Sequence, residues 1–521
     1  MLILQSDNHC GVDNKASSKS RNKSLDTKTS RAEIQFCSFL AEHNLSFKVM
    51  DHLTPLLQEC FPDSEIVKQM RLKSSKSVCV IKNVIGYAEK EELAGKLQKT
   101  FFSVLIDVST DISMTQTLCI IVRYYDEDLG RIVSHFWELC KIFNDDSKEV
   151  STTAQHLFNC VRESFQRFSV SFDKIIGFGS DGCNAIMGKN NSVRTRFGKC
   201  CPNIYIMTCI CHSLHLCASE ACDSIPSDCE KLFHSIYNHF SSSCKRQHEF
   251  KQYQQFLELK NHKILRPVEI RWLSVTAVVT RLLETKTTST TINFETEELI
   301  LQQLNDPIIK LYYHFLEWIL PKFSSLNKLF QSEKPLITVV HKTMSSTYVE
   351  LLKNFMVANY VNKTPLSEIN PADESKYVNI LNVYTGVNSI DFFNKPEYSK
   401  SLLKEVKIEF LTNCRSFLVK GCLAIQKRYD FDNILLKNLF IINPAEAMAQ
   451  STRNKIPSLL PLMKQLPRLV TKECYQSIDN EWRQLPSFTL PEDIKVTDPV
   501  DSFWHKLKKF EDKDGIWSFE N

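Results

Sequence analysis

The 521-residue sequence lacks a long apolar run, an amino-terminal signal peptide and an excess of one charge. No run approaches the roughly 18 apolar residues that a membrane span requires. The apolar start of the chain, MLIL, breaks off after four residues, which is too short for a secretory signal. The 64 basic and 60 acidic residues leave a formal net charge of +4, which does not by itself indicate a nucleic-acid partner. We therefore expect a soluble protein without a membrane partner.

The 19 cysteines indicate neither a disulfide framework nor a zinc module. They are scattered through helical and strand patterns, and Cys10, Cys37, Cys60 and Cys79 form no Cys-x-x-Cys pair. We expect reduced thiols, as in a protein of the nucleus or cytoplasm. Without a zinc finger, the chain also lacks a common device for reading a DNA duplex in sequence.

Length and composition favour several folding units, because 521 residues exceed what a single core normally supports. The hydrophobic content of 43% and charged content of 24% are ordinary for globular proteins. Residues 1–30 are rich in Ser, Lys, Asn and Asp without periodicity, and we expect a disordered basic tail. That tail is either a solvated segment, which we favour, or a localisation or phosphate-contacting element.

Two aspartates each close an apolar run that is typical of a β-strand, Asp107 in FFSVLID and Asp181 in KIIGFGSD. Between them, LCIIVRYY and RIVSHFWELCKIF flank the turn DEDLG, which predicts a meander of three strands. Helical spacing of apolar residues predicts a helix over about 148–168. A strand that returns through such a helix lies parallel to the first one, so both carboxylates should reach the same edge of the sheet.

The segment after Asp181 predicts a helix from near Asn184 to just before Pro202. Arg194, Arg196 and Lys199 on this helix can either contact a DNA backbone or form a solvated face.

The run IYIMTC at 204–209 predicts a fifth strand that leads into a further helix. Cys209 and His212 lie one helical turn apart there, as do Cys211 and His215. They can form half of a soft-metal site or, as we favour, pack beside the sheet edge, because four ligands on one helix cannot close a tetrahedron.

Four stretches, in this order and at these intervals, resemble the hAT superfamily of DNA transposases, and more narrowly the vertebrate host proteins derived from such elements. They are VLIDVSTD, IIGFGSDGCNAIMG, the Cys209-Ile-Cys211-His212 stretch, and IRWLS at 270–274. The resemblance runs from roughly Ser30 to the end of the chain. It implies an α/β fold, a ribonuclease H-like mixed sheet interrupted by a large all-helical insertion domain.

The resemblance also implies roles for single residues. Asp107 and Asp181 match the first two acids of the family's metal site, and Cys209 and His212 match its Cys-x-x-His element. In the insertion, the Arg-Trp pair of the family matches Arg271 and Trp272, with the aromatic ring near the DNA. For Trp272, packing in the core is the alternative.

The family's third acid is a glutamate in a Glu-Arg-x-Phe-Ser motif within the dimerisation region, and this chain has no such motif. None of the remaining candidates, Glu481, Glu492, Glu511 and Glu520, lies in a matching context. Transfer of a phosphoryl group with two metal ions needs several anionic oxygens, whereas two aspartates hold one ion weakly. We therefore expect a vestigial metal-binding pair, no required cofactor, and a role for Mg²⁺ only if the site is active.

The predicted domains follow from these motifs and from the helical periodicity after the fifth strand. They are a disordered basic tail (1–30), a helical amino-terminal region (31–100), a ribonuclease H-like core (101–226), a helical insertion domain (227–485) and a truncated carboxyl-terminal segment without the dimerisation region (486–521).

The resemblance, together with the missing third acid, implies a transposase-derived protein, nuclear rather than cytoplasmic, that is not an enzyme. We expect a nucleic-acid-binding or regulatory scaffold with weak, nonspecific DNA contacts and unidentified protein partners. Two alternatives stay open: an active Mg-dependent transposase or nuclease, and a pure protein-interaction scaffold without DNA binding.

Overall fold

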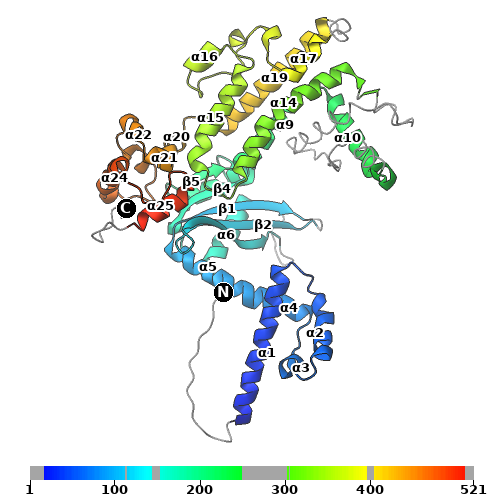
Figure 1. Cartoon of the computed structure of the whole chain (residues 1–521), viewed down its shortest axis with the longest axis vertical. Helices are drawn as coiled ribbons and strands as arrows, with labels where there is room; N and C mark the ends of the chain where they lie inside the picture. The colour runs from blue at the N-terminus through cyan, green and yellow to red at the C-terminus, as the bar shows by residue number, and fades with distance from the viewer. Residues whose placement is uncertain are drawn as a thin grey trace. The chain divides into compact units, whose positions relative to one another are not determined.

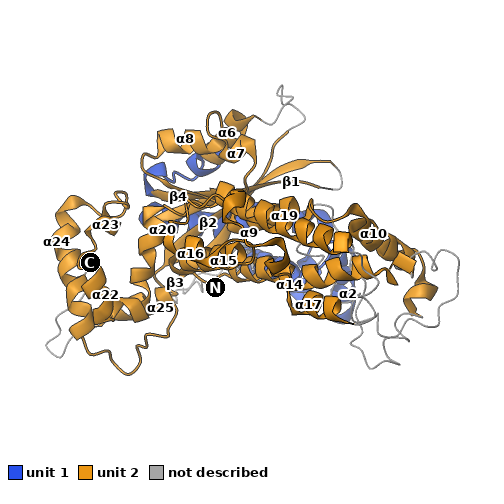
Figure 2. Cartoon of the chain, turned by 90° about the horizontal axis from the view of Figure 1, so that it is seen from above, with its two compact units in different colours: residues 1–100, 163–174 blue, residues 101–162, 175–521 orange. Residues whose placement is uncertain are grey.

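The structure is a computed structural model that describes residues 17–111, 114–143, 153–248, 302–303, 305–395 and 404–510. Two compact units divide the chain (Figure 2): unit 1 comprises residues 1–100 and 163–174, and unit 2 comprises residues 101–162 and 175–521. Across the described ranges, no helix is both long and apolar enough to cross a membrane.

Unit 1 is built from helices around a small apolar core. They are α1 (Ser17–Glu42), α2 (Val49–Cys60), α3 (Glu65–Gln69), α4 (Ser74–Val80), the π-helical turn Ile81–Ile85 and α5 (Gly86–Lys99). The core consists of Cys37, Leu40, Met50, Met70 and Leu72. The buried carboxylate of Glu33 on α1 accepts the Arg71 backbone N–H at 2.9 Å and pairs with Lys76 at 2.6 Å, which ties α1 to α4.

Helix α1 starts at Ser17, inside the segment 1–30 that the sequence predicts to be disordered. From Lys23 onward the first buried side chain of this helix is Thr29, followed by Glu33 and Cys37. Because these early turns bury almost no apolar surface, they carry no periodic apolar signal in the sequence.

Unit 2 contains a mixed sheet of five strands in the order β3-β2-β1-β4-β5 (Figure 1). The antiparallel meander consists of β1 (Phe102–Thr110), β2 (Gln116–Asp126) and β3 (Arg131–Lys141), and β4 (Ile175–Ser180) and β5 (Tyr205–Thr208) add in parallel beside β1. The predicted meander and the predicted return of the fourth strand beside the first are confirmed. The predicted α/β fold class is confirmed as well.

One face of the sheet is covered by α6 (Ala154–Gln166) and α8 (Val193–Cys200). Phe178 of β4 stacks on Phe197 of α8 with ring centroids 4.4 Å apart, and Phe158 of α6 meets the same ring edge-on at 5.3 Å. All three rings are buried. The predicted helix between the third and fourth strands is confirmed from Ala154, and its expected start near Lys148 lies outside the described residues.

The single helix predicted from Asn184 to Pro202 is wrong, because the segment forms two helices, α7 (Asn184–Met187) and α8. Ser192 caps the start of α8: its hydroxyl accepts the Thr195 backbone N–H at 3.2 Å, while the Thr195 hydroxyl accepts the Ser192 N–H at 3.1 Å. These two bonds satisfy backbone N–H groups at the first turn of α8, so a separate helix begins here. The polar run GKNNS therefore separates α7 from α8.

The described residues after β5 are mostly helical and share one large apolar core. The helices are α9 (Ile210–Cys222), α10 (Ser227–Ser241), α14 (Pro307–Phe330), α15 (Ile337–Lys353), α16 (Ala358–Lys363), α17 (Val387–Asn394), α19 (Lys404–Arg428), α20 (Ile434–Asn438), α21 (Pro444–Ala447), α22 (Gln450–Lys455), α23 (Leu460–Met463), α24 (Tyr475–Gln484) and α25 (Val500–Lys508). Short 3₁₀ turns occur among them at Glu374–Lys376, Ile380–Asn382, Leu439–Ile442, Lys472–Cys474 and Leu485–Ser487, and another, Phe172–Lys174, precedes β4.

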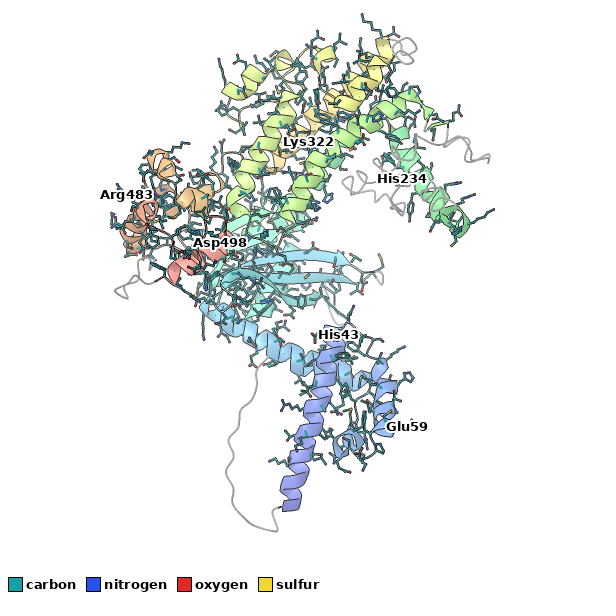
Figure 3. The ribbon with its side chains drawn as sticks, viewed as in Figure 1. His43, Glu59, His234, Lys322, Arg483 and Asp498 are labelled. Carbon is teal, nitrogen blue, oxygen red and sulfur yellow. The ribbon has the colours of Figure 1, made fainter. Side chains whose placement is uncertain are left out.

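Helices α9, α14, α15 and α19 pack side by side (Figure 1). Two ion pairs link them: Lys322 of α14 with Glu350 of α15 (Lys322 is labelled in Figure 3), and Arg428 of α19 with Glu220 of α9. The Arg428 guanidinium lowers the pKa of the Glu220 carboxyl mainly by hydrogen bonding to it. The described part of the predicted insertion is helical, but its apolar core also includes residues of α9 and of Val500–Lys508, and the predicted boundaries remain predictions.

Helix α25 returns the chain to the sheet. Its Asp501 carboxylate accepts the Ile132 backbone N–H at 3.0 Å, at the start of β3. Its His505 ring hydrogen-bonds the Tyr125 hydroxyl and lies against Gly130, whose φ of +63° and lack of a side chain both suit glycine. An ion pair of 2.8 Å between Asp498 and Lys506 closes the turn before this helix (Asp498 is labelled in Figure 3). The segment predicted as a truncated end therefore covers part of the β3 edge.

The aromatic cluster around Phe197 predicts a clear difference between two phenylalanines of unit 2. We expect Phe197→Ala to lower the free energy of unfolding by about 3–5 kcal/mol, because it leaves a cavity between two rings. Phe136→Ala removes a side chain that is 62% exposed on β3, and we expect a change within about 0.5 kcal/mol. Urea unfolding followed by fluorescence measures both, and equal losses in the two variants would contradict the packing described.

Candidate carboxylate site at the sheet edge

The pairing between three parallel strands ends in register at one edge of the sheet. Ile106 of β1 pairs with Ser180 of β4, and Ser180 pairs with Thr208 of β5. The buried Ser180 hydroxyl donates to the Ile106 carbonyl at 2.8 Å, which links β1 to β4 at this position. The backbone N–H of Cys209 donates to the Ser180 carbonyl at 2.8 Å and continues the link to β5.

The residues that follow this last paired row are Asp107, Asp181 and Cys209. Because neighbouring strands lie about 4.8 Å apart, they place the two aspartates side by side at one edge. Asp107 is exposed and Asp181 is half-buried. The two sequence-predicted aspartates are thus brought together, and a thiol is the next group in the row.

Asp107 does not end its strand, contrary to the prediction. β1 continues to Thr110, and Asp107 pairs with Cys119 of β2. What ends at Ile106 is the ladder with β4, because β4 stops at Ser180. The longer antiparallel hairpin keeps β1 extended past its parallel neighbour, so Asp107 lies at the edge of the β1–β4 pair but within β1.

The carboxylates of the two aspartates contribute to the raised pKa of two neighbouring thiols. Burial, and then the carboxylate of Asp107, raises the pKa of Cys119 on the facing strand. Burial raises the pKa of Cys183 as well, with a smaller contribution from Asp181. The Ser180 hydroxyl lies 3.3 Å from one Asp181 oxygen and fixes the start of the turn that carries it.

No further metal ligand joins the pair in the part of the chain that the structure describes. Within those residues, no three His, Cys, Asp or Glu side chains lie together in a way that can hold a metal ion. Glu481 belongs to α24 and Glu492 precedes α25, while Glu511 and Glu520 lie outside the described residues. Asp107 and Asp181 fit a single hard cation that keeps most of its water ligands, and they do not fit two closely spaced ions.

The Cys-x-x-His element lies at the start of α9, with Cys209 as the cap residue and His212 in the first turn. The other pair of this segment packs against α14: the Cys211 thiol lies 3.6 Å from the Asn327 carbonyl, and the His215 ring lies 3.2 Å from the Asn327 side-chain nitrogen. These contacts support the packing interpretation over a zinc site.

The basic residues proposed for DNA contact differ in whether their side chains are exposed or already hydrogen-bonded within the protein. Arg194 on α8 is exposed. Arg196 donates from Nε to Gln155 of α6 at 2.8 Å and from a guanidinium nitrogen to the Ser192 carbonyl at 3.0 Å, so it holds α8 to α6. Arg271 and Trp272 lie outside the described residues.

Sequence reasoning missed one contributor to this edge. Ser180 belongs to a motif but has no predicted role, although its hydroxyl bonds the neighbouring strand. Cys209, which the sequence places at the end of the predicted fifth strand, lies next to this row as the packing interpretation expects.

Comparisons with known proteins match the region that contains the two aspartates to a known domain family. Residues 57–192, which include both aspartates, match the family DUF4371, described as "ZMYM1/FAM200, RNase-like domain". A stretch of 145 residues is 27% identical to General transcription factor II-I repeat domain-containing protein 2 of Mus musculus and covers 25% of this chain and 15% of that protein. A stretch of 235 residues is 23% identical to the Bos taurus protein of the same name and covers 43% and 23%.

This chain therefore spans less than a quarter of the length of these two relatives. The similarity concerns part of each protein, and it supports an RNase-like domain in this chain together with a relationship to the vertebrate proteins named above.

The two-aspartate edge predicts weak binding of one divalent cation. We expect a single Mn²⁺ ion to bind with a dissociation constant on the order of a millimolar, because two carboxylates are few ligands for a hard cation. Asp107→Asn and Asp181→Asn should each abolish this binding, and Asp128→Asn, an exposed carboxylate beyond the opposite end of β2, should leave it unchanged. Electron paramagnetic resonance of free Mn²⁺ measures the binding, and two tightly bound ions would contradict the prediction.

Proposed function

We propose that this chain is a domesticated, transposase-derived protein of the hAT type that acts in the nucleus as a nucleic-acid-binding or regulatory scaffold without catalysis. The observation that carries the proposal is the edge where Asp107 and Asp181 follow a shared register, flanked by Ser180 and Cys209. The RNase-like match over residues 57–192 and the hAT-like motifs on the same strands support it.

The ligands described at this edge support the proposed absence of catalysis. Hydrolysis or transfer at a phosphodiester with two metal ions needs anionic oxygens that bridge both ions and hold them a few ångström apart. The hydroxyl of Ser180 is neutral and already donates to the Ile106 carbonyl. A cysteine sulfur is a soft ligand and a poor partner for Mg²⁺. The groups beside the aspartates therefore do not complete a hard two-metal site.

Nucleic-acid binding in this proposal rests on basic side chains at separate positions on the surface. With a net charge of +4, overall charge adds little attraction to DNA, so contacts should be few, sequence-independent and sensitive to salt. Exposed Arg194 on α8 and exposed Lys23, Lys28 and Arg31 on α1 supply such positions. We expect affinity in the range of nonspecific binding, with dissociation constants of roughly 10⁻⁶ to 10⁻⁴ M.

An active Mg-dependent transposase or nuclease is the second candidate, because the strand register does align the two acids. A pure protein-interaction scaffold is the third, and Phe136 and Leu139 favour it, since these apolar side chains of β3 are 62% and 54% exposed.

A cleavage assay separates the first two candidates. We expect the purified chain and Asp107→Ala to leave single- and double-stranded DNA equally intact in the presence of Mg²⁺ or Mn²⁺. Gel analysis of end-labelled DNA measures this. Metal-dependent cleavage by the wild-type chain that is lost in Asp107→Ala would overturn the proposal in favour of the active enzyme.

A binding assay separates the first and third candidates and uses two arginines of α8. We expect Arg194→Ala to weaken binding to a fluorescent DNA duplex and to reduce the salt dependence by about one phosphate contact. Arg196→Ala should lower the thermal unfolding temperature with little effect on binding, because its guanidinium holds α8 to α6. Fluorescence anisotropy at several salt concentrations measures binding. No binding at low salt would favour the pure protein scaffold.

A further inference from the structure

A cavity of about 160 Å³ lies beside β5, within unit 2. Its walls come from β5, α9, α15, α19, α20 and the turn between the last two, all labelled in Figure 1 except the turn. Every residue of β5, from Tyr205 to Thr208, lines it. Because successive side chains of a strand point to opposite faces of a sheet, a cavity lined by all of them lies along the edge of the strand. β5 has a free edge, since it is the last strand of the sheet.

The backbone groups that face this edge belong to Ile206 and Thr208. In a parallel ladder, each residue directs both its N–H and its C=O group to the same side, and the side alternates along the strand. The Cys209 N–H donates to the Ser180 carbonyl of β4, so Met207, two residues earlier, also faces β4. Ile206 and Thr208 therefore direct their backbone groups away from β4. Within the described ranges, no hydrogen-bonding group meets them on that side.

These backbone groups offer an acceptor beside a donor. The Ile206 C=O and the Thr208 N–H are consecutive on the outer edge, because both groups of Met207 point inward. A ligand that carries a donor next to an acceptor can bind both groups at once, as a further strand would. Adenine carries such a pair, an amino group next to a ring nitrogen.

The surroundings of the edge suit a flat ring. A ring that lies in the plane of the edge would contact strand side chains on both of its faces, because these side chains stand alternately above and below. Three buried apolar side chains line the helical walls: Leu214 of α9, Met344 of α15 and Ile425 of α19. The Met344 thioether is a favourable partner for an aromatic ring.

The size of the cavity excludes a peptide or a nucleic-acid strand as its occupant. Pockets for drug-sized ligands measure roughly 300–1,000 Å³. The cavity beside β5 measures about 160 Å³. It therefore accepts one small molecule.

The charges in the walls favour an uncharged ligand over a phosphate. Arg428 lines the cavity, but its guanidinium hydrogen-bonds both carboxylate oxygens of Glu220. Asp430 also lines the cavity and is exposed, and it has no ion-pair partner in the part of the chain that the structure describes. The charge that is left uncompensated is therefore negative, and it repels a phosphate group.

We propose that the cavity beside β5 binds an uncharged heterocycle of the 6-aminopurine type, either the free base or its nucleoside. The amino group donates to the Ile206 carbonyl, and the adjacent ring nitrogen accepts the Thr208 N–H. The inference goes beyond the proposed scaffold function, and it depends neither on DNA binding nor on the two aspartates.

Isothermal titration calorimetry of the full chain tests this recognition with adenine, adenosine, unsubstituted purine and AMP. We expect adenine or adenosine to bind with a dissociation constant on the order of 10⁻⁴ M, as suits a ligand of this size. Purine should bind about tenfold more weakly than adenine, because it lacks the amino donor. AMP should bind about fivefold more weakly than adenosine, because Asp430 repels its phosphate.

The same titrations distinguish the two sources of the ring. Adenosine that binds at least as tightly as adenine assigns the site to the nucleoside, and binding of adenine alone assigns it to the free base, so both results support the proposal. Binding of neither, equal binding of purine and adenine, or tighter binding of AMP than of adenosine would overturn it.

A proline at position 208 removes the backbone donor that the ligand uses. Edge strands tolerate proline where the N–H faces outward, so Thr208→Pro should keep the pairing of β5 with β4. Thr208→Val retains the N–H and nearly the same shape, and it is the matched control. We expect Thr208→Pro to weaken binding of the preferred ligand about tenfold and Thr208→Val to leave it unchanged.

A second variant tests the cavity without altering the strand. Ser213→Phe adds a ring at a half-buried position of the α9 wall and should abolish binding, whereas Ser213→Ala, which adds no volume, should retain it. Circular dichroism and thermal unfolding show which variants are folded. Unchanged binding in a folded Ser213→Phe or Thr208→Pro chain would overturn the proposal.

Discussion

The parallel pairing of β4 with β1 is the constraint on which the rest of unit 2 depends. It forces the chain through α6 before β4 can form, and it ends in the buried bond from the Ser180 hydroxyl to the Ile106 carbonyl. β5 then adds to β4 in the same register, and α9 starts where β5 ends. Because a one-residue slip would turn every side chain to the opposite face, the buried row Val104, Ile106 and Phe178 fixes the position of both aspartates.

The fold was largely predictable where apolar periodicity is strong. The meander, α6 and the two parallel strands bury alternating or helically spaced apolar residues, and these patterns are visible in the sequence. Prediction failed where polar caps or long-range contacts determine where a helix or strand begins and ends. The break between α7 and α8 depends on the reciprocal bonds of Ser192 and Thr195, and the early turns of α1 bury almost nothing.

The candidate site was predictable in its acids and not in its surroundings. Asp107 and Asp181 stand out because each follows an apolar run. The extension of β1 to Thr110 depends on the length of the facing strand, which the first run does not encode. The role of Ser180 becomes evident only once the register of the strands is known, because its hydroxyl bonds the carbonyl of Ile106, which is far away in the sequence.

The sheet edge combines groups of different chemistry. The two aspartates supply hard carboxylate ligands, and the next residue in the row, Cys209, carries a soft sulfur that is a poor ligand for Mg²⁺. The proposed scaffold function uses the shape of such a domain and does not require a complete two-metal site.

An engineered disulfide tests the central geometry most directly. In a Cys209→Ser background, cysteines placed at 107 and 181 would have Cα atoms about 5 Å apart if the two strands are neighbours in the described register. The account predicts a bridge between positions 107 and 181 after mild oxidation, found by peptide mapping. Failure of these two cysteines to bridge in a folded chain, while cysteines placed at 107 and 183 do so, would contradict it.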